Sequence, residues 1–96
     1  MSEPNTLEAG RAETDAVMAL LRAVHDALDL PLPGLADQDE RDYHRLLTDR
    51  AAVARIVLAG VLEHDHALES ATAYLRGRTD TAPVTYTPWE DKGAPV

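Results

Sequence analysis

The chain contains no cysteine, no phenylalanine and a single lysine among its 96 residues. Without cysteine it forms no disulfide and offers no thiolate to a metal ion. Its aromatic residues are three tyrosines and one tryptophan, so any core must be built mainly from aliphatic side chains. Such packing suits closely spaced helices better than β-sheets, which favour aromatic and β-branched residues.

Long hydrophobic runs are also missing. The longest apolar stretch, residues 49–62, is interrupted by Arg55 and is shorter than the roughly 20 residues that span a bilayer. The first ten residues lack the basic and apolar regions of a signal peptide. We therefore expect a cytoplasmic protein with no membrane partner. Basic residues are almost all arginine, a usage typical of bacteria with G+C-rich genomes.

The charge is strongly one-sided, with a formal net value of −8 spread along the chain. Such a surface opposes contact with nucleic-acid phosphates and favours solubility or basic partners. Nucleic acid is therefore not an expected partner.

Residues 49–62 are the stretch around which the chain is expected to be organised. Ala, Val, Leu and Ile dominate it, strand-like alternation is absent, and alanine is the best helix former. A helix that is apolar on nearly every side should be buried on nearly every side. We expect Gly60 to allow another helix to approach closely.

The rest of the chain predicts an all-α fold, a small helical bundle of about four helices. The first helix is identified by apolar residues at helical spacing and is ended by Pro31, which disfavours helical geometry in the residue before it. Its apolar face consists of Val17, Leu20, Leu21, Val24 and Leu28. The predicted helices span residues 6–29, 37–47, 49–63 and 66–77.

Connections and boundaries follow from local signals. The proline-rich segment 30–35 is predicted to be a strap whose leucines tuck into the end of the bundle. Asp37 with Glu40 resembles a capping box, and Thr48 with Asp49 offers a new cap, although one continuous helix over 38–63 is the alternative.

Breaks near the end of the helical region follow similar signals. We expect a break at residues 64–66, with Asp65 capping the last helix, and a stop at Gly77. The predicted organisation is a helical domain over 1–78 and an extended Pro/Thr-rich tail over 79–96.

Motifs for chemistry are scarce. Glu63, His64, Asp65 and His66 are potential metal ligands, but the two histidines lie about 200° apart on a helix and cannot share an ion. No phosphate-binding glycine loop or activated nucleophile is visible. We expect no enzyme activity, no catalytic or metal residues and no cofactor; a metal-dependent enzyme is the weakest hypothesis, and a small-molecule ligand stays open.

DNA binding by a helix-turn-helix at 37–47 and 49–63 is an alternative, but the second helix is too apolar to read base edges. A further alternative is an acidic regulator that occupies a nucleic-acid-binding protein.

The favoured function is a small protein-interaction module, with a protein partner or self-association as a dimer. The tail carries Tyr86 and Trp89, residue types enriched among binding anchors. We expect them to fold back over the bundle, with binding to a partner as the alternative. If the other helices do not cover residues 49–62, the exposed side of Val53, Ile56 and Val57 becomes the binding face.

Overall fold

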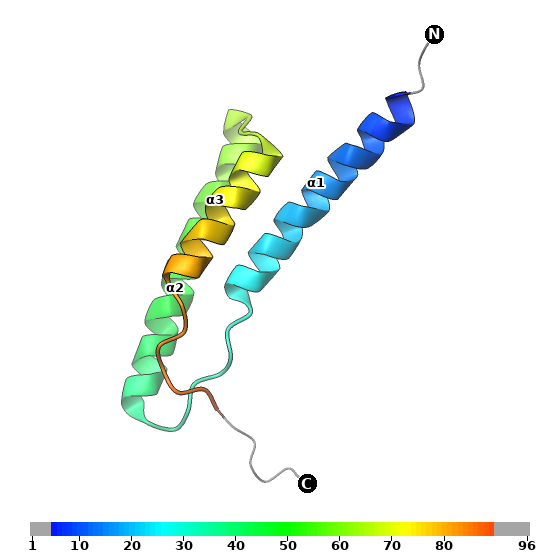
Figure 1. Ribbon diagram of the computed structural model, residues 1–96. Helices are drawn as coiled ribbons and strands as arrows, with labels where there is room; N and C mark the ends of the chain where they lie inside the picture. The colour runs from blue at the N-terminus through cyan, green and yellow to red at the C-terminus, as the bar shows by residue number, and fades with distance from the viewer. Residues whose placement is uncertain (1–4, 90–96) are drawn as a thin grey trace, which may run out of the picture.

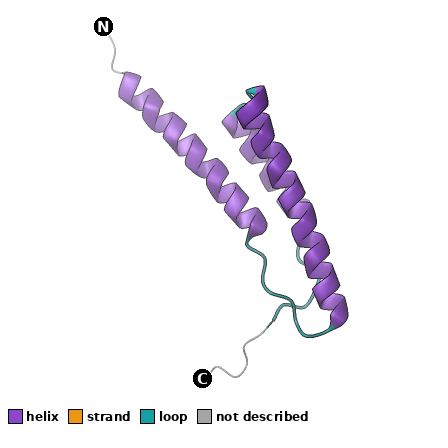
Figure 2. Cartoon of the chain, turned by 180° about the vertical axis from the view of Figure 1, so that it is seen from behind, coloured by secondary structure: helices purple, strands orange, loops and turns teal. Residues whose placement is uncertain are grey.

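The computed structural model describes residues 5–89, and this part of the chain is all-helical, as predicted. It contains three helices: α1 (Asn5–Leu28), α2 (Asp37–His64) and α3 (Leu68–Thr81). α2 and α3 form an antiparallel hairpin, and α1 packs against it through its C-terminal half while its N-terminal half projects away (Figure 1). The same divergence is visible from behind (Figure 2).

The bounds of α1 agree with the prediction, but the predicted break in α2 at Thr48 and Asp49 is wrong. Residues 37–64 form one helix, which is the continuous alternative. Thr and Asp can cap a helix but do not end one, and no proline or glycine lies between residues 37 and 59 to interrupt the backbone hydrogen bonds. Three helices therefore replace the four expected.

The start of α2 also differs from the predicted capping box. The N-cap is Ala36, which provides no side-chain hydrogen bond, and Asp37 and Glu40 lie within the first turn. Carboxylates there stabilise the helix through its dipole, because the N-terminal end carries partial positive charge.

The break between α2 and α3 is confirmed, whereas the role expected for Asp65 is wrong. Asp65 is the C-cap of α2 in the left-handed conformation, with φ 59°, and its N–H and that of His66 point to the carbonyl of Gly60. The N-cap of α3 is Ala67. Asp is among the few non-glycine residues that adopt this conformation readily.

α3 does not stop at Gly77 as predicted but continues to Thr81. Glycine weakens a helix without ending it. The helix ends where Ala82, the residue before Pro83, leaves helical geometry at φ −130° and ψ 69°.

The core lies where the three helices meet. It is made of small and medium side chains, with one fully buried large residue, Leu75. Its members are Leu20, Ala23 and Ala27 of α1, Val53 and Val57 of α2, and Ala71 and Leu75 of α3. Alanines allow the helix backbones to approach closely.

One burial prediction is wrong and another is right only in part. Residues 49–62 are not buried on most sides, since Ile56 is 66% and Leu62 79% exposed. The predicted face of α1 is confirmed for Leu20 and in part for Val24, whereas Val17, Leu21 and Leu28 are exposed and the alanines of α1 are the most buried. In a bundle of three helices each helix buries only the side that faces the other two. A helix that is apolar on every side therefore leaves apolar residues exposed.

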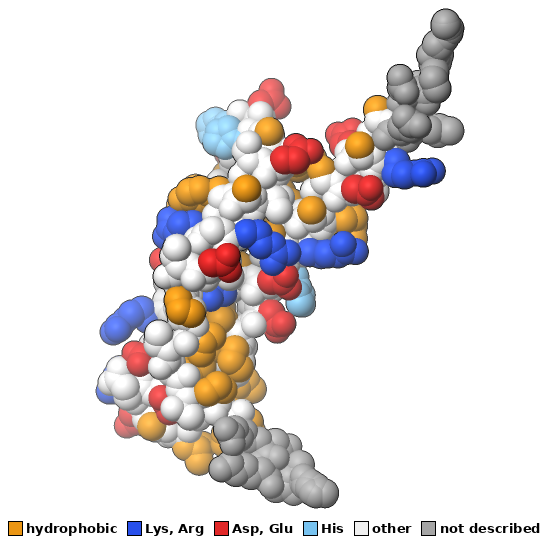
Figure 3. All heavy atoms as spheres, in the orientation of Figure 1, with side chains coloured by type: hydrophobic (Ala, Val, Ile, Leu, Met, Phe, Trp, Pro, Cys, Tyr) orange, Lys and Arg blue, Asp and Glu red, His pale blue; other side chains and the backbone are white. Residues whose placement is uncertain are grey.

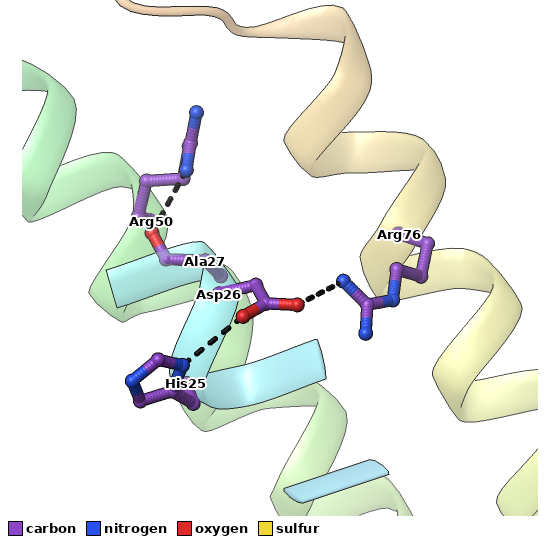
Figure 4. Close-up of polar contacts among 5 residues, drawn as sticks. All are labelled: His25, Asp26, Ala27, Arg50 and Arg76. Atoms are coloured by element: carbon purple, nitrogen blue, oxygen red, sulfur yellow. Dashed lines mark hydrogen bonds and ion pairs between the residues drawn. The ribbon is translucent and has the colours of Figure 1, made fainter. Parts of the chain in front are cut away.

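Two arginines, Arg50 and Arg76, make polar contacts that fix the helices relative to one another (Figure 4). Arg50 of α2 is 6% exposed and donates to the carbonyls of Ala27 at 2.8 Å and Ala82 at 2.6 Å, at the C-terminal ends of α1 and α3. Arg76 of α3 donates to the carboxylate of Asp26 on α1 at 2.6 Å. A cation at helix C-termini is favoured by the helix dipoles.

The segment after α3 returns to the connection between α1 and α2. Gly34 N–H donates to Thr87 O at 2.8 Å and Trp89 N–H to Leu32 O at 2.7 Å, around a bridge between Pro33 and Pro88. We call this pairing of residues 30–35 with 86–89 the clasp. Of the strap leucines, Leu30 is half-buried. Leu32 and Leu35 are not tucked in as expected, since they are 64% and 86% exposed.

Candidate interaction surface

Among the described residues, more large apolar side chains are exposed than are buried. Five large ones are buried: Leu20, Val53, Val57, Leu75 and Tyr86. Eleven are exposed: Val17, Met18, Leu21, Leu28, Leu32, Leu35, Ile56, Leu62, Tyr74, Val84 and Trp89. Scattered apolar residues are normal on a surface, but contiguous ones mark interaction sites. The exposed apolar residues that lie next to one another are therefore the candidates for an interaction site.

Ile56 and Tyr74 lie together, on the two sides of a groove between α2 and α3. The groove has a volume of about 640 Å³. Its lining consists of Ile56 and Val57 from α2, His66 and Ala67 from the turn, and Ser70, Ala71 and Tyr74 from α3. Val57 and Ala71 belong to the core, so the floor of the groove is the outer surface of the core itself.

The groove lies on the face of the α2–α3 hairpin that α1 does not cover. Arg76 reaches α1 through Asp26. Tyr74 is two residues away from Arg76, which on an α-helix is a rotation of about 200°. One face of the hairpin therefore receives α1, and the opposite face has no helix on it within the described residues.

One end of the groove is shaped by Gly60 and His66. The imidazole ring of His66 lies directly on the backbone of Gly60, and a Cβ at position 60 would collide with the ring Nδ1. The glycine thus admits a side chain from the following turn, not another helix as expected. A smaller hollow of about 300 Å³ continues beyond His66 toward His64 and Arg55.

The other end of the groove has a cationic edge. Arg78 donates to the hydroxyl of Tyr74 at 3.0 Å, and its guanidinium carbon lies 5.9 Å from the centre of the tyrosine ring. This contact restricts the Tyr74 side chain, which is 53% exposed. An aromatic side chain that is already restricted loses less entropy on binding.

A second apolar surface lies at the clasp end of the molecule, where hydrophobic side chains gather in the space-filling view (Figure 3). Leu32, Leu35, Val84 and Trp89 are all exposed there, and Trp89 retains 49% of its surface. Tyr86 in the same segment is buried, packs edge-on against the ring of Tyr43 and donates to Pro31 O at 2.6 Å.

The five predicted binding residues thus fall into different environments. Ile56 and Trp89 are exposed, Ile56 on the groove between α2 and α3 and Trp89 at the clasp. Val53 and Val57 are core residues, 8% and 7% exposed, and Tyr86 is 5% exposed and holds the clasp. The prediction that the aromatic residues fold back is confirmed for Tyr86, while Trp89 stays about half exposed.

Tyr74 and His66 were not among the residues predicted to form an interaction surface. A signal for Tyr74 was present: it lies on α3 away from the apolar stripe of Leu68, Ala71 and Leu75, so it could not be a core residue. No sequence signal identifies His66, because its position depends on the left-handed turn at Asp65.

Among the residues that the structure describes, three titratable groups have shifted pKa values. The hydrogen bond from Arg76, followed by that from His25, lowers the pKa of Asp26, and the hydrogen bond with Asp26 raises the pKa of His25. Burial raises the pKa of Tyr86. None of the three lines the groove, so these shifts concern stability and not the chemistry of the surface.

Within residues 5–89, no three His, Asp or Glu side chains are grouped to hold a metal ion. The helix-turn-helix hypothesis requires a turn between 37–47 and 49–63, where the structure has continuous helix. In the described part of the chain, no helix has the length and apolar character needed to cross a bilayer. Comparisons with protein-family models, curated proteins and solved structures return no match.

Proposed function

We propose that this chain is a small helical protein-interaction module. The observation that carries the proposal is the uncovered groove of the α2–α3 hairpin, with Ile56 and Tyr74 exposed on either side of a floor formed by the core. Apolar grooves between helices are typical receptors for a further helix. A partner helix would complete the burial that α1 provides on the opposite face.

Trp89 and its neighbours provide a second surface of the same character, because tryptophan and tyrosine are the residue types most enriched among binding hot spots. The groove and the clasp have no residue in common, so a module of this shape can hold two proteins, or two copies of itself and a further partner.

Photo-crosslinking in the cells that carry the gene tests the proposal. A benzophenone amino acid is introduced at Ile56, at Trp89 and, as a matched control, at the exposed polar position Arg22, and the adducts are identified by mass spectrometry. We expect defined protein adducts, either with the chain itself or with another protein, at Ile56 or Trp89 and none at Arg22. Absence of adducts at both apolar positions would remove the basis of the proposal.

A second candidate is an acidic regulator of a nucleic-acid-binding protein. It is favoured by the exposed carboxylates on the projecting half of α1, Glu13 and Asp15, together with the net charge of −8. Binding of this kind weakens as the salt concentration rises, because exposed charges are screened beyond about 8 Å at physiological ionic strength. Adducts captured at Glu13 but at neither apolar position would favour this candidate.

A further inference from the structure

The face that carries the groove suggests a specific occupant. We propose that it packs against the same face of a second copy, so that α2 and α3 of both chains form a four-helix bundle with each α1 on the outside. This inference rests on the proposed interaction function and specifies its partner. Three features of the described residues support it.

The first is the direction of the helices. α2 and α3 are antiparallel. A two-fold axis that runs along the helices places α2 of one copy against α3 of the other, so all four neighbouring pairs in the bundle are antiparallel. This is the arrangement of up-down four-helix bundles, and a two-fold contact uses one self-complementary surface.

The second is the pattern of charge around the groove. Asp49 and Glu63 lie seven residues before and after Ile56, close to two turns each, so all three share one side of α2. On α3 Arg78 follows Tyr74 by one turn, and His66 lies at the opposite end of the groove. Each end of the face therefore has a carboxylate on the α2 side and a basic side chain on the α3 side.

This pattern selects between the two-fold arrangements. With the axis along the helices, Asp49 faces Arg78 of the second copy, and Glu63 faces the imidazole of His66, whose ring N–H can donate to it. With the axis across the helices, Asp49 would face Glu63 and Arg78 would face His66. Complementary charges suppress wrong registers, so the first arrangement is the one we propose.

The third is the size of the face. Fourteen residues of α3 rise about 21 Å, and two helices side by side are roughly 20 Å wide. The flat contact is therefore roughly 400 Å² per chain, about half of the roughly 800 Å² of accessible surface per partner that is standard, a size typical of weak or transient contacts. We expect a dimer that dissociates in the micromolar range.

Sedimentation velocity of the full chain, at loadings from about 1 to 200 μM to bracket a micromolar Kd, tests the proposal. We expect the sedimentation coefficient to rise from monomer to dimer over this range. Ile56→Glu should raise the Kd by more than about tenfold, because it buries an unpaired charge. Leu21→Glu, on a 51% exposed residue of α1, is the matched control and should leave the Kd unchanged, because each α1 lies on the outside of the proposed bundle.

A charge reversal tests the register. Asp49→Arg and Arg78→Asp should each weaken the dimer, and the double variant Asp49→Arg/Arg78→Asp should restore it. Circular dichroism and urea unfolding check that every variant is folded. A monomer at all concentrations, an unchanged Kd for Ile56→Glu, or no restoration in the double variant would overturn the proposal.

The self-association and the interaction function can be tested separately. If the purified chain is monomeric and a crosslinker at Ile56 captures a different protein, the self-association is wrong and the interaction function stands. If the chain is monomeric and neither apolar position captures any protein, both are wrong.

Discussion

At the scale of single residues, Arg50 holds the helices together by hydrogen bonds in a small core that contains few large apolar side chains. Its guanidinium joins the carbonyl ends of α1 and α3, although it lies on α2 and is nearly buried. No carboxylate among the described residues pairs with it, so the carbonyls and the dipoles of two helices provide the compensation.

We predict that Arg50→Met lowers the free energy of unfolding by about 2–4 kcal/mol. Methionine keeps the apolar stem but leaves two carbonyls without their charged donor. Each lost hydrogen bond costs about 1.5–3 kcal/mol. Part of this cost is offset because the variant no longer buries a charge. Urea titration measures the change. Arg55→Met, on an exposed arginine of the same helix, should change it by less than about 0.5 kcal/mol. Equal effects of the two variants would show that the carbonyl contacts do not hold the helices.

Gly60 and His66 form a second residue-scale pair, in which the ring of one occupies the space that a side chain of the other would need. Gly60→Ala should therefore destabilise the native chain by about 1 kcal/mol, since the displaced ring outweighs the gain in helix propensity. In the background of His66→Ala the same change should stabilise by about 1 kcal/mol. A double-mutant cycle by urea titration measures this reversal of sign, and additive effects would contradict it.

At the scale of elements, the sequence predicted where helices exist better than where they end. The apolar spacing identified α1 to within a residue at each end. Thr48 and Asp49 were misleading because a side chain that can cap a helix is equally able to lie on its exposed surface. Gly77 was misleading for a related reason: α3 passes through it and stops only at the geometry that Pro83 imposes on Ala82. The clasp could not be predicted, since its hydrogen bonds join residues more than 50 positions apart.

Thr48→Ala distinguishes the two interpretations of α2 by its sign. In a continuous helix the exposed threonine is replaced by a better helix former, and stability should rise by up to about 0.5 kcal/mol. At an N-cap the same change would cost about 1 kcal/mol. Thermal unfolding at fixed protein concentration is a suitable measurement. Thr48→Gly is the control and should lower the stability by a few tenths of a kcal/mol, as glycine does within a helix.

The clasp makes a prediction of its own through Tyr86. Removing the hydroxyl that donates to Pro31 O in Tyr86→Phe should cost about 1 kcal/mol, the usual net value of one hydrogen bond. Tyr43→Phe, which alters the ring that packs edge-on against Tyr86 but removes no hydrogen bond seen within residues 5–89, should cost less. Urea titration compares the two variants, and a larger loss for Tyr43→Phe would mean that the hydroxyl contact is not what holds the tail.

At the scale of the whole molecule, the candidate surface exists because three helices are too few to cover every apolar side of α2. The sequence indicated that residues 49–62 need partners on several sides, and it named Ile56 correctly as an exposed residue. Which of Val53, Ile56 and Val57 would be covered depended on the direction from which α1 and α3 approach, and that direction is set by the contacts of Arg50 and Arg76 with α1. Of the three residues of the expected face, Ile56 is exposed, whereas Val53 and Val57 are buried in the core.

The contact between α1 and α3 also links the packing of the whole molecule to pH. The lowered pKa of Asp26 means that its contribution to stability is present above the ordinary value of 3.8 and is lost as the pH falls through the native pKa. The raised pKa of His25 means that its contribution is complete below 6.5 and is lost as the pH rises through the native pKa. Both are present together between these values.

Asp26→Asn removes both contributions, because Asp26 is the partner of Arg76 and of His25. The urea midpoint of the native chain should exceed that of Asp26→Asn most clearly near pH 5, and the difference should shrink toward pH 3 and toward pH 8. Added salt should reduce it throughout, since Asp26 and Arg76 are both about half exposed. Asp15→Asn, on the projecting half of α1, is the matched control and should show no such maximum. A difference independent of pH would mean that the ion pair does not hold α1 against the hairpin.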